Sequence, residues 1–169
     1  MYTTLDTKKT NELLLVRRGW FNPEYELTDN TDSYGKMNYR WFPKVMATAT
    51  TAASTWGFRR EGGLSRTILI IDQTGAVIGK ATREIFSRIT VLSLQTGFMA
   101  KFYRPSIWSR EHVWESDGYG KIMHFRCNPF RFTTTIAIDQ SMAPASVIPL
   151  LIFFGSYLIT LRRRQRAAR

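Results

Sequence analysis

The sequence predicts an all-β protein: a closed antiparallel barrel of about twelve strands that encloses a hydrophobic C-terminal α-helix. Three observations lead to this prediction. Residues 11–139 consist of short apolar or alternating runs separated by Gly, Pro, Asn and Asp, which is typical of strands joined by hairpins. Aromatic residues make up 14% of the chain, and they favour strands. After Asp139 the pattern changes to one long uncharged segment. A chain of 169 residues has the usual length of one domain, so residues 1–169 are interpreted as a single domain.

Twelve stretches have the composition of strands. In chain order they are ELLLVR from Glu12, EYELT from Glu24, GKMNYRW from Gly35, KVMATA from Lys44, TWGFRR from Thr55, RTILII from Arg66, AVIGKAT from Ala76, RITVLSL from Arg88, FMAKFYR from Phe98, HVWES from His112, KIMHFRC from Lys121 and FTTTIAI from Phe132. The fourth is the weakest prediction, because the Thr/Ala run MATATTAAST is equally compatible with a loop or a short helical turn.

The connections between these stretches have the composition of tight turns. The sequences at 28–35, 72–75 and 116–120 combine Gly, which accepts a positive φ, with Asp and Asn, which bond their own backbone. Consecutive hairpins build an antiparallel meander. A flat sheet of this width would expose two unpaired edges, whereas closure into a barrel removes them.

The last apolar segment is predicted to be a helix. From Val147 to Leu161 there is no charged residue, and the run is too long for a strand. The predicted helix covers about 146–162, with Ser146 as the N-cap and Pro149 in the first turn, where a missing N–H costs nothing. Residues 162–169 are predicted to form a basic tail beyond it.

An apolar helix must be buried all round, in lipid or in protein. Residues 147–161 would span about 22 Å as a helix, which is short of a hydrocarbon core of about 30 Å. A barrel of twelve strands lies between the filled eight-stranded and the open sixteen-stranded kinds, so its lumen should accommodate a helix about 10 Å across. The core helix is therefore preferred, and a tail anchor formed by residues 147–161 is the alternative.

This combination resembles the Tubby C-terminal-like superfamily, which includes Tubby domains, LURP-one-related proteins and phospholipid scramblases. The stretch ILIIDQTGAVIGKATRE looks like a hairpin of the LURP-one and scramblase branches, and TTTIAIDQSMAPASVIPLLIFFGSYLI is similar to their last strand and helix entry. The resemblance covers roughly residues 11–165 and rests on architecture more than on signature residues. It implies membrane or phosphoinositide association. The Tubby lipid site cannot be matched residue by residue, and the scramblase-type cysteine-rich and calcium segments are missing, so scrambling is not carried over.

Charge points to the same class of partner. The net charge is +11, and the arginines after the apolar segment are concentrated near its end. We therefore predict a non-enzymatic binding module that docks on anionic phospholipid or phosphoinositide. The predicted contact residues are Arg162, Arg163, Arg164 and Arg166. The alternatives are the tail-anchored protein and a nucleic-acid-binding barrel, for which basic and aromatic residues mix in RPSIWSR at 104–110.

No catalytic motif is visible, so no enzyme activity, cofactor or metal is predicted. His112 and His124 flank one predicted hairpin turn almost symmetrically, and Cys127 follows three residues after the second. In a regular strand, however, Cys127 points to the opposite face from His124, which disfavours a zinc site. With one cysteine and only a short apolar run near the N-terminus, we expect a cytoplasmic monomer, peripheral to a membrane.

Overall fold

A computed structural model of the chain describes residues 1–19, 23–40, 46–62, 65–85, 87–128, 133–139 and 142–167. It contains twelve strands followed by one helix, α1 (Ile148–Ala167). The strands are β1 (Glu12–Arg18), β2 (Glu24–Thr28), β3 (Ser33–Arg40), β4 (Met46–Thr51), β5 (Thr55–Arg60), β6 (Thr67–Asp72), β7 (Val77–Arg83), β8 (Thr90–Leu94), β9 (Met99–Tyr103), β10 (Glu111–Ser116), β11 (Gly120–Cys127) and β12 (Thr133–Ile138).

The strands form a closed barrel in which every neighbouring pair is antiparallel. Each strand pairs with the one before and after it, and β1 closes the sheet by pairing with β12, with Leu13 opposite Ile136. The predicted fold class is confirmed, including β4, the weakest of the predicted strands. Parts of three predicted strands, at Trp41, at 44–45 and at Phe132, lie outside the described residues.

Alternation along the strands gives the barrel its apolar interior. In β1, Leu13 and Leu15 are buried while the residues between and beyond them are only half-buried or exposed. In β3, Met37 and Tyr39 are buried, and Asn38 between them is exposed. Because successive side chains of a strand point to opposite faces, this pattern directs one face of each strand inward.

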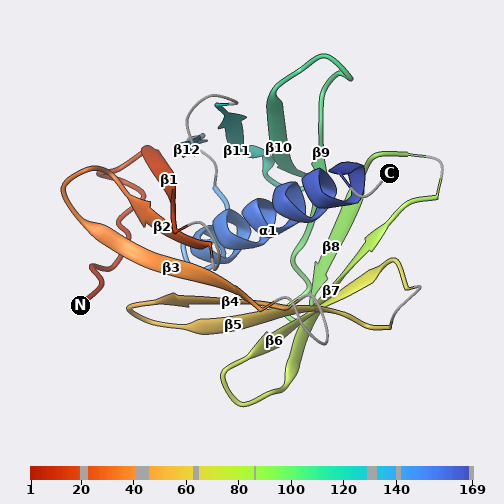
Figure 1. The fold of residues 1–169 in the computed structure, drawn as a ribbon, viewed down its shortest axis with the longest axis horizontal. Helices are drawn as coiled ribbons and strands as arrows, with labels where there is room; N and C mark the ends of the chain where they lie inside the picture. Colours follow the sequence, from red (N-terminus) through yellow and green to blue (C-terminus); the bar gives the residue numbers. More distant parts are fainter. Residues whose placement is uncertain are drawn as a thin grey trace.

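Helix α1 occupies that interior, and Figure 1 shows it running along the inside of the barrel with strands around it. Every residue from Ile148 to Ile159 is buried except Pro149, which is half-buried and lies in the first turn as predicted. The prediction that the apolar segment forms the core is therefore confirmed. No helix in the described part of the chain has both the length and the apolarity that a membrane span requires.

Two of the polar side chains on α1 satisfy their hydrogen bonds within the helix. The Ser156 hydroxyl donates to the Ile152 carbonyl at 2.7 Å, and the Thr160 hydroxyl donates to the Ser156 carbonyl at 3.0 Å. Burying a hydroxyl is costly only when it lacks a partner, so these residues fit an apolar lumen.

The ends of α1 differ from the prediction. The helix begins at Ile148, two residues after the predicted cap, and it continues to Ala167, so the prediction that residues 162–167 form a separate tail is wrong. Arginine is a good helix former, and cations near a helix C-terminus interact favourably with its dipole. These two effects extend the helix past the last apolar residue, while residues 168–169 lie outside the described residues.

A glycine in the middle of α1 sets how closely the helix approaches the wall. A Cβ atom added at Gly155 would lie 2.7 Å from the Phe125 ring and 2.7 Å from the Trp114 indole nitrogen. That indole nitrogen donates a hydrogen bond to the Leu151 carbonyl at 2.9 Å, which ties β10 to the helix. Both rings are fully buried, so neither has space into which it can move.

We predict that Gly155→Ala destabilises the protein, although alanine is the better helix former by about 1 kcal/mol. The added methyl overpacks rigid rings, at a cost of about 1–3 kcal/mol that outweighs the propensity gain. Urea unfolding measures the difference. Gly118→Ala is the control, because a Cβ there meets no atom within 4 Å and should change stability little. An equal effect of the two substitutions would contradict the tight approach.

Candidate anion-binding site

The direction of the strands gathers the arginines at one end of the barrel. Odd-numbered strands end, and even-numbered strands begin, at the mouth where the C-terminal end of α1 lies. We call this end the arginine mouth, because arginines occur at or next to these strand ends at Arg18, Arg40, Arg60, Arg66, Arg83, Arg88, Arg104 and Arg110. Arginines of the last turns of α1 lie at the same end. The strand order thus converts scattered arginines into one cationic surface.

The opposite mouth carries carboxylates. Asp29 and Asp32 lie in the β2–β3 connection, Asp72 ends β6, Asp117 lies in the β10–β11 turn, and Asp139 follows β12. This mouth is where α1 begins, and negative charge is favourable near a helix N-terminus as positive charge is near a C-terminus. Arginine therefore predominates at the C-terminal end of α1 and aspartate at its N-terminal end, which complements the helix dipole, although Glu24, Glu61, Glu84 and Glu111 also lie at the arginine mouth.

A cavity of about 340 Å³ opens at the arginine mouth between α1 and the strands β7 to β11. Seven arginines line it, and no carboxylate does: Arg83, Arg88, Arg104, Arg110, Arg162, Arg163 and Arg166. Within the described part of the chain, none of the seven forms an ion pair. Cationic groups gathered without a counter-charge create a positive potential that a bound anion neutralises.

Arg162 is the innermost of these arginines. Its guanidinium donates to the Arg88 carbonyl at 2.9 Å and to the Thr90 hydroxyl at 3.0 Å, and its Cζ lies 5.5 Å from the centre of the Phe102 ring. Burial, followed by the charges of Arg83 and other neighbouring arginines, lowers its pKa to about 10. Arg162 was predicted to begin an exposed basic tail, but its side chain is half-buried against β8 and β9.

Arg104, a second arginine that lines the cavity, shows the same kind of pKa shift. The pKa of Arg104 is lowered, first by burial and then by the charges of Arg166 and Arg88. The lowered pKa values of both guanidinium groups reflect burial first and repulsion between the arginines second. A phosphate or carboxylate group in the cavity would relieve it, and arginine matches such groups with paired hydrogen bonds.

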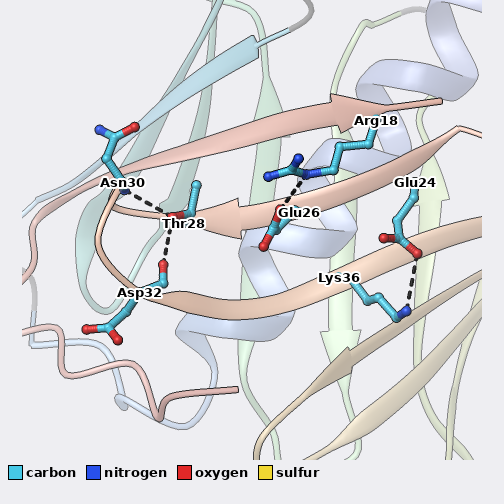
Figure 2. Close-up of polar contacts among 7 residues, drawn as sticks. All are labelled: Arg18, Glu24, Glu26, Thr28, Asn30, Asp32 and Lys36. Atoms are coloured by element: carbon cyan, nitrogen blue, oxygen red, sulfur yellow. Dashed lines mark hydrogen bonds and ion pairs between the residues drawn. The ribbon is translucent and has the colours of Figure 1, made fainter. Parts of the chain in front are cut away.

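Several basic side chains outside the cavity form ion pairs with carboxylates. Figure 2 shows the Arg18 Nε atom 2.6 Å from the Glu26 carboxylate and the Lys36 ammonium 3.2 Å from the Glu24 carboxylate, all on β1 to β3. On β10 and β11, Arg126 pairs with Glu111 at 2.6 Å. These basic side chains have a carboxylate partner, whereas the arginines that line the cavity have none among the described residues.

The structure brings three of the four predicted contact residues into one cavity. Arg162, Arg163 and Arg166 line it, whereas Arg164 lies on the side of α1 near β1 to β3. Burial lowers the pKa of Arg164, and the hydroxyls of Tyr25 and Tyr39 partly oppose this shift. The sequence interpretation missed the arginines from the strands, which are Arg83, Arg88, Arg104 and Arg110. A signal for them existed, because arginine recurs at every second connection of the meander, and those connections share one end.

The histidines and the cysteine form no metal site. His124 is paired with Val113 and His112 with Phe125, so the two histidines are one position out of register and lie on opposite faces of the sheet. Their near-symmetrical placement about the turn therefore does not bring the two histidines opposite each other, whereas the predicted separation of Cys127 from His124 is confirmed. No cluster of metal-ligating side chains occurs among the residues that the structure describes. His124 instead lies 2.9 Å from the Asp139 carboxylate.

His112 belongs to the cavity. Its ring stacks on Phe102, with the ring centres 5.5 Å apart and the planes inclined by 11°. Burial is the main cause that lowers its pKa to about 4, and the charges of Arg162, Arg104, Arg163 and Arg166 add to the effect. The imidazole is therefore neutral at pH 7, and the positive charge of the cavity comes from arginine alone.

Taken together, the fold and this site define a helix-filled antiparallel barrel with a cationic cavity at one mouth. Comparison with protein-family models, with curated proteins and with solved structures finds no match for the chain. The resemblance to the Tubby C-terminal-like superfamily stays a prediction from the sequence.

The lowered pKa of His112 predicts a specific loss of stability in acid. The unfolded chain binds the proton near the ordinary pKa of 6.5 and the folded protein only near about 4. The contribution of the neutral ring is therefore complete above pH 6.5 and is lost as the pH falls to 4, amounting to about 3 kcal/mol. His112→Phe keeps the stacking and removes the titration, so its unfolding free energy should fall less between pH 7 and pH 4.

Urea unfolding at both pH values measures this difference. His124→Gln is the matched control, because it removes the other histidine and leaves His112 in place. Equal acid sensitivity of His112→Phe and the unaltered protein would contradict the buried, neutral imidazole.

Proposed function

We propose that the protein is a non-enzymatic binding module that docks the arginine mouth on an anionic membrane surface. In this proposal it is a peripheral protein of the cytoplasmic leaflet, where anionic lipids give a negative surface potential. The ligand is the phosphate of a phospholipid or phosphoinositide headgroup. The observation that carries the proposal is the cavity lined by seven arginines and no carboxylate.

Phosphate suits this cavity for electrostatic and geometric reasons. Unpaired guanidinium groups converge on it from β7 to β10 and from α1, so an anion inside can receive hydrogen bonds from several directions. The segregation of charge also orients the whole molecule. A barrel in which arginine predominates at one end and aspartate at the other turns its arginine mouth toward a negative surface before contact.

A membrane is favoured over a nucleic acid by where the charge lies. Single-stranded nucleic acid is bound along a basic groove that follows its backbone over several nucleotides. Here the unpaired arginines surround a cavity at one end, while basic residues on the walls at β1–β3 and β10–β11 are paired with glutamates. This arrangement suits a lipid headgroup bound at the arginine mouth better than a nucleic-acid chain bound along the side of the barrel.

We predict that a triple substitution in the cavity weakens binding to acidic vesicles. Arg104→Gln, Arg163→Gln and Arg166→Gln together remove three cavity charges and leave the anchored Arg162 in place. At about 1 kcal/mol per basic residue, affinity for phosphatidylserine-containing vesicles should fall about 100-fold. Vesicle flotation or sedimentation at low salt measures the loss.

The matched control removes the same charge from the other end. Lys8→Gln, Lys9→Gln and Lys121→Gln together change the net charge equally, and these residues lie near the opposite mouth. Equal losses in the two triple variants would show that total charge rather than the cavity governs binding. Absence of binding by the unaltered protein, or binding of a soluble inositol polyphosphate without vesicle binding, would overturn membrane docking. Preference for single-stranded RNA over acidic vesicles would favour the nucleic-acid alternative.

A further inference from the structure

The β9–β10 connection carries two exposed apolar side chains at the tip of an ordered turn. The Ser109 amide donates to the Ser106 carbonyl at 3.2 Å, which places Ile107 and Trp108 at the centre of the turn. Ile107 is 57% exposed and Trp108 is 87% exposed. Central turn positions usually hold small, polar or conformationally special residues. The geometry of the turn therefore does not account for two large apolar side chains at these positions.

Hydrogen bonds hold this turn in shape. The Trp108 amide donates to the Ser106 hydroxyl at 3.2 Å, and the Glu111 amide donates to the Ser109 hydroxyl at 3.0 Å. The side chain of Arg104 also donates to the Ser109 carbonyl. A cavity arginine therefore supports the loop directly, so the apolar tip and the cationic cavity form one structural unit.

A third exposed apolar residue lies at the same mouth. Ile85, in the β7–β8 connection, is 70% exposed and borders a depression lined by four arginines and one carboxylate: Arg60, Arg66, Arg83, Arg162 and Glu84. The two connections flank the cavity, because Arg83 and Arg88 come from one and Arg104 and Arg110 from the other. Exposed apolar residues therefore lie on both sides of the arginine-lined cavity.

Exposed apolar residues also occur at the opposite mouth, and their surroundings differ. Met99, Tyr119 and Met142 are exposed there, with Asp117 and Asp139 close to them in the chain. Aspartates and lysines are mixed at that end, so an anionic bilayer attracts the arginine mouth more strongly. Charge complementarity therefore selects which apolar residues reach the lipid.

From these observations we infer that the β9–β10 and β7–β8 connections are membrane-insertion loops: Trp108, Ile107 and Ile85 enter the bilayer interface while the arginine cavity holds a lipid phosphate. This inference rests on the proposed function and adds the orientation of the bound protein: the arginine mouth faces the membrane. Tryptophan suits this position, since its ring is apolar and its indole N–H finds partners at the level of the headgroups. Attraction of basic residues and burial of apolar ones then act together on the same lipid surface.

Paired substitutions separate the apolar contribution from the electrostatic one. Ile107→Ser with Trp108→Ser should lower affinity for phosphatidylserine-containing vesicles about tenfold or more, since both side chains lose their burial in lipid. The same variant should bind inositol hexakisphosphate with unchanged affinity, because the cavity arginines remain. Met99→Ser with Met142→Ser is the matched control at the opposite mouth and should bind vesicles normally.

Depth measurements test the insertion itself. The chain has one cysteine, Cys127, so Trp108→Cys in a Cys127→Ser background places a single environment-sensitive fluorophore at the loop tip. Its emission should shift to shorter wavelength on vesicle binding and be quenched by brominated lipids. The same label in Met142→Cys should stay in water. Because Cys127 is buried, a second measurement uses the unsubstituted background: brominated lipids should quench the unaltered protein more than Trp108→Phe.

The outcomes distinguish this inference from the proposed function. Vesicle binding that depends on the cavity arginines, with the Trp108 label remaining in water and the serine variant unimpaired, overturns insertion and keeps electrostatic docking. Failure of the unaltered protein to bind acidic vesicles overturns both. Quenching of Trp108 by single-stranded RNA, but not by brominated vesicles, would show that the indole stacks on bases instead.

Discussion

The structure depends on one constraint: a helix that is apolar on every side must be enclosed on every side. The core part of α1 leaves no polar stripe for solvent, and a layered sheet would cover only one face of it. A closed sheet covers all faces, and a barrel of this strand number needs a filling that side chains alone do not supply. Helix and barrel therefore require each other, and the closure of β1 on β12 is as necessary as the apolar interior.

The same closure gives the molecule two distinct ends. In a meander each connection lies at the opposite end from the one before, so residues that recur at alternate connections collect at one mouth. Arginine recurs in this way, and the helix delivers Arg162 into the middle of the resulting ring. The cavity is thus a product of topology more than of any local motif. It also explains why the cationic groups lack partners, because the aspartates of the turns are at the far end of the barrel.

The sequence predicted the architecture well and the site only in part. Alternating apolar residues indicate strands directly, and the long uncharged segment from Val147 indicates a helix. Even β4, the weakest predicted strand, was therefore placed correctly. The arginines of α1 that line the cavity were singled out from the composition of the chain end. Arg83 and Arg104 were missed because their proximity depends on strand order, and the histidine pairing was wrong because the β10–β11 register shifts at Trp114/Glu115, which symmetry about the turn does not reveal. Register and closure are tertiary properties that local patterns do not contain.

The position of α1 at the end of the strand sequence has a consequence for how the protein folds. During synthesis all twelve strands leave the ribosome before the helix that fills them, and β1 must wait for β12. Until α1 is made, the strands therefore lack the apolar segment that fills their interior. Pairing of the first and last strands also gives the slowest kind of contact, one between distant parts of the chain. The inner face of the strands therefore has no partner in water until the final segment arrives, and exposed apolar surface of this kind promotes aggregation.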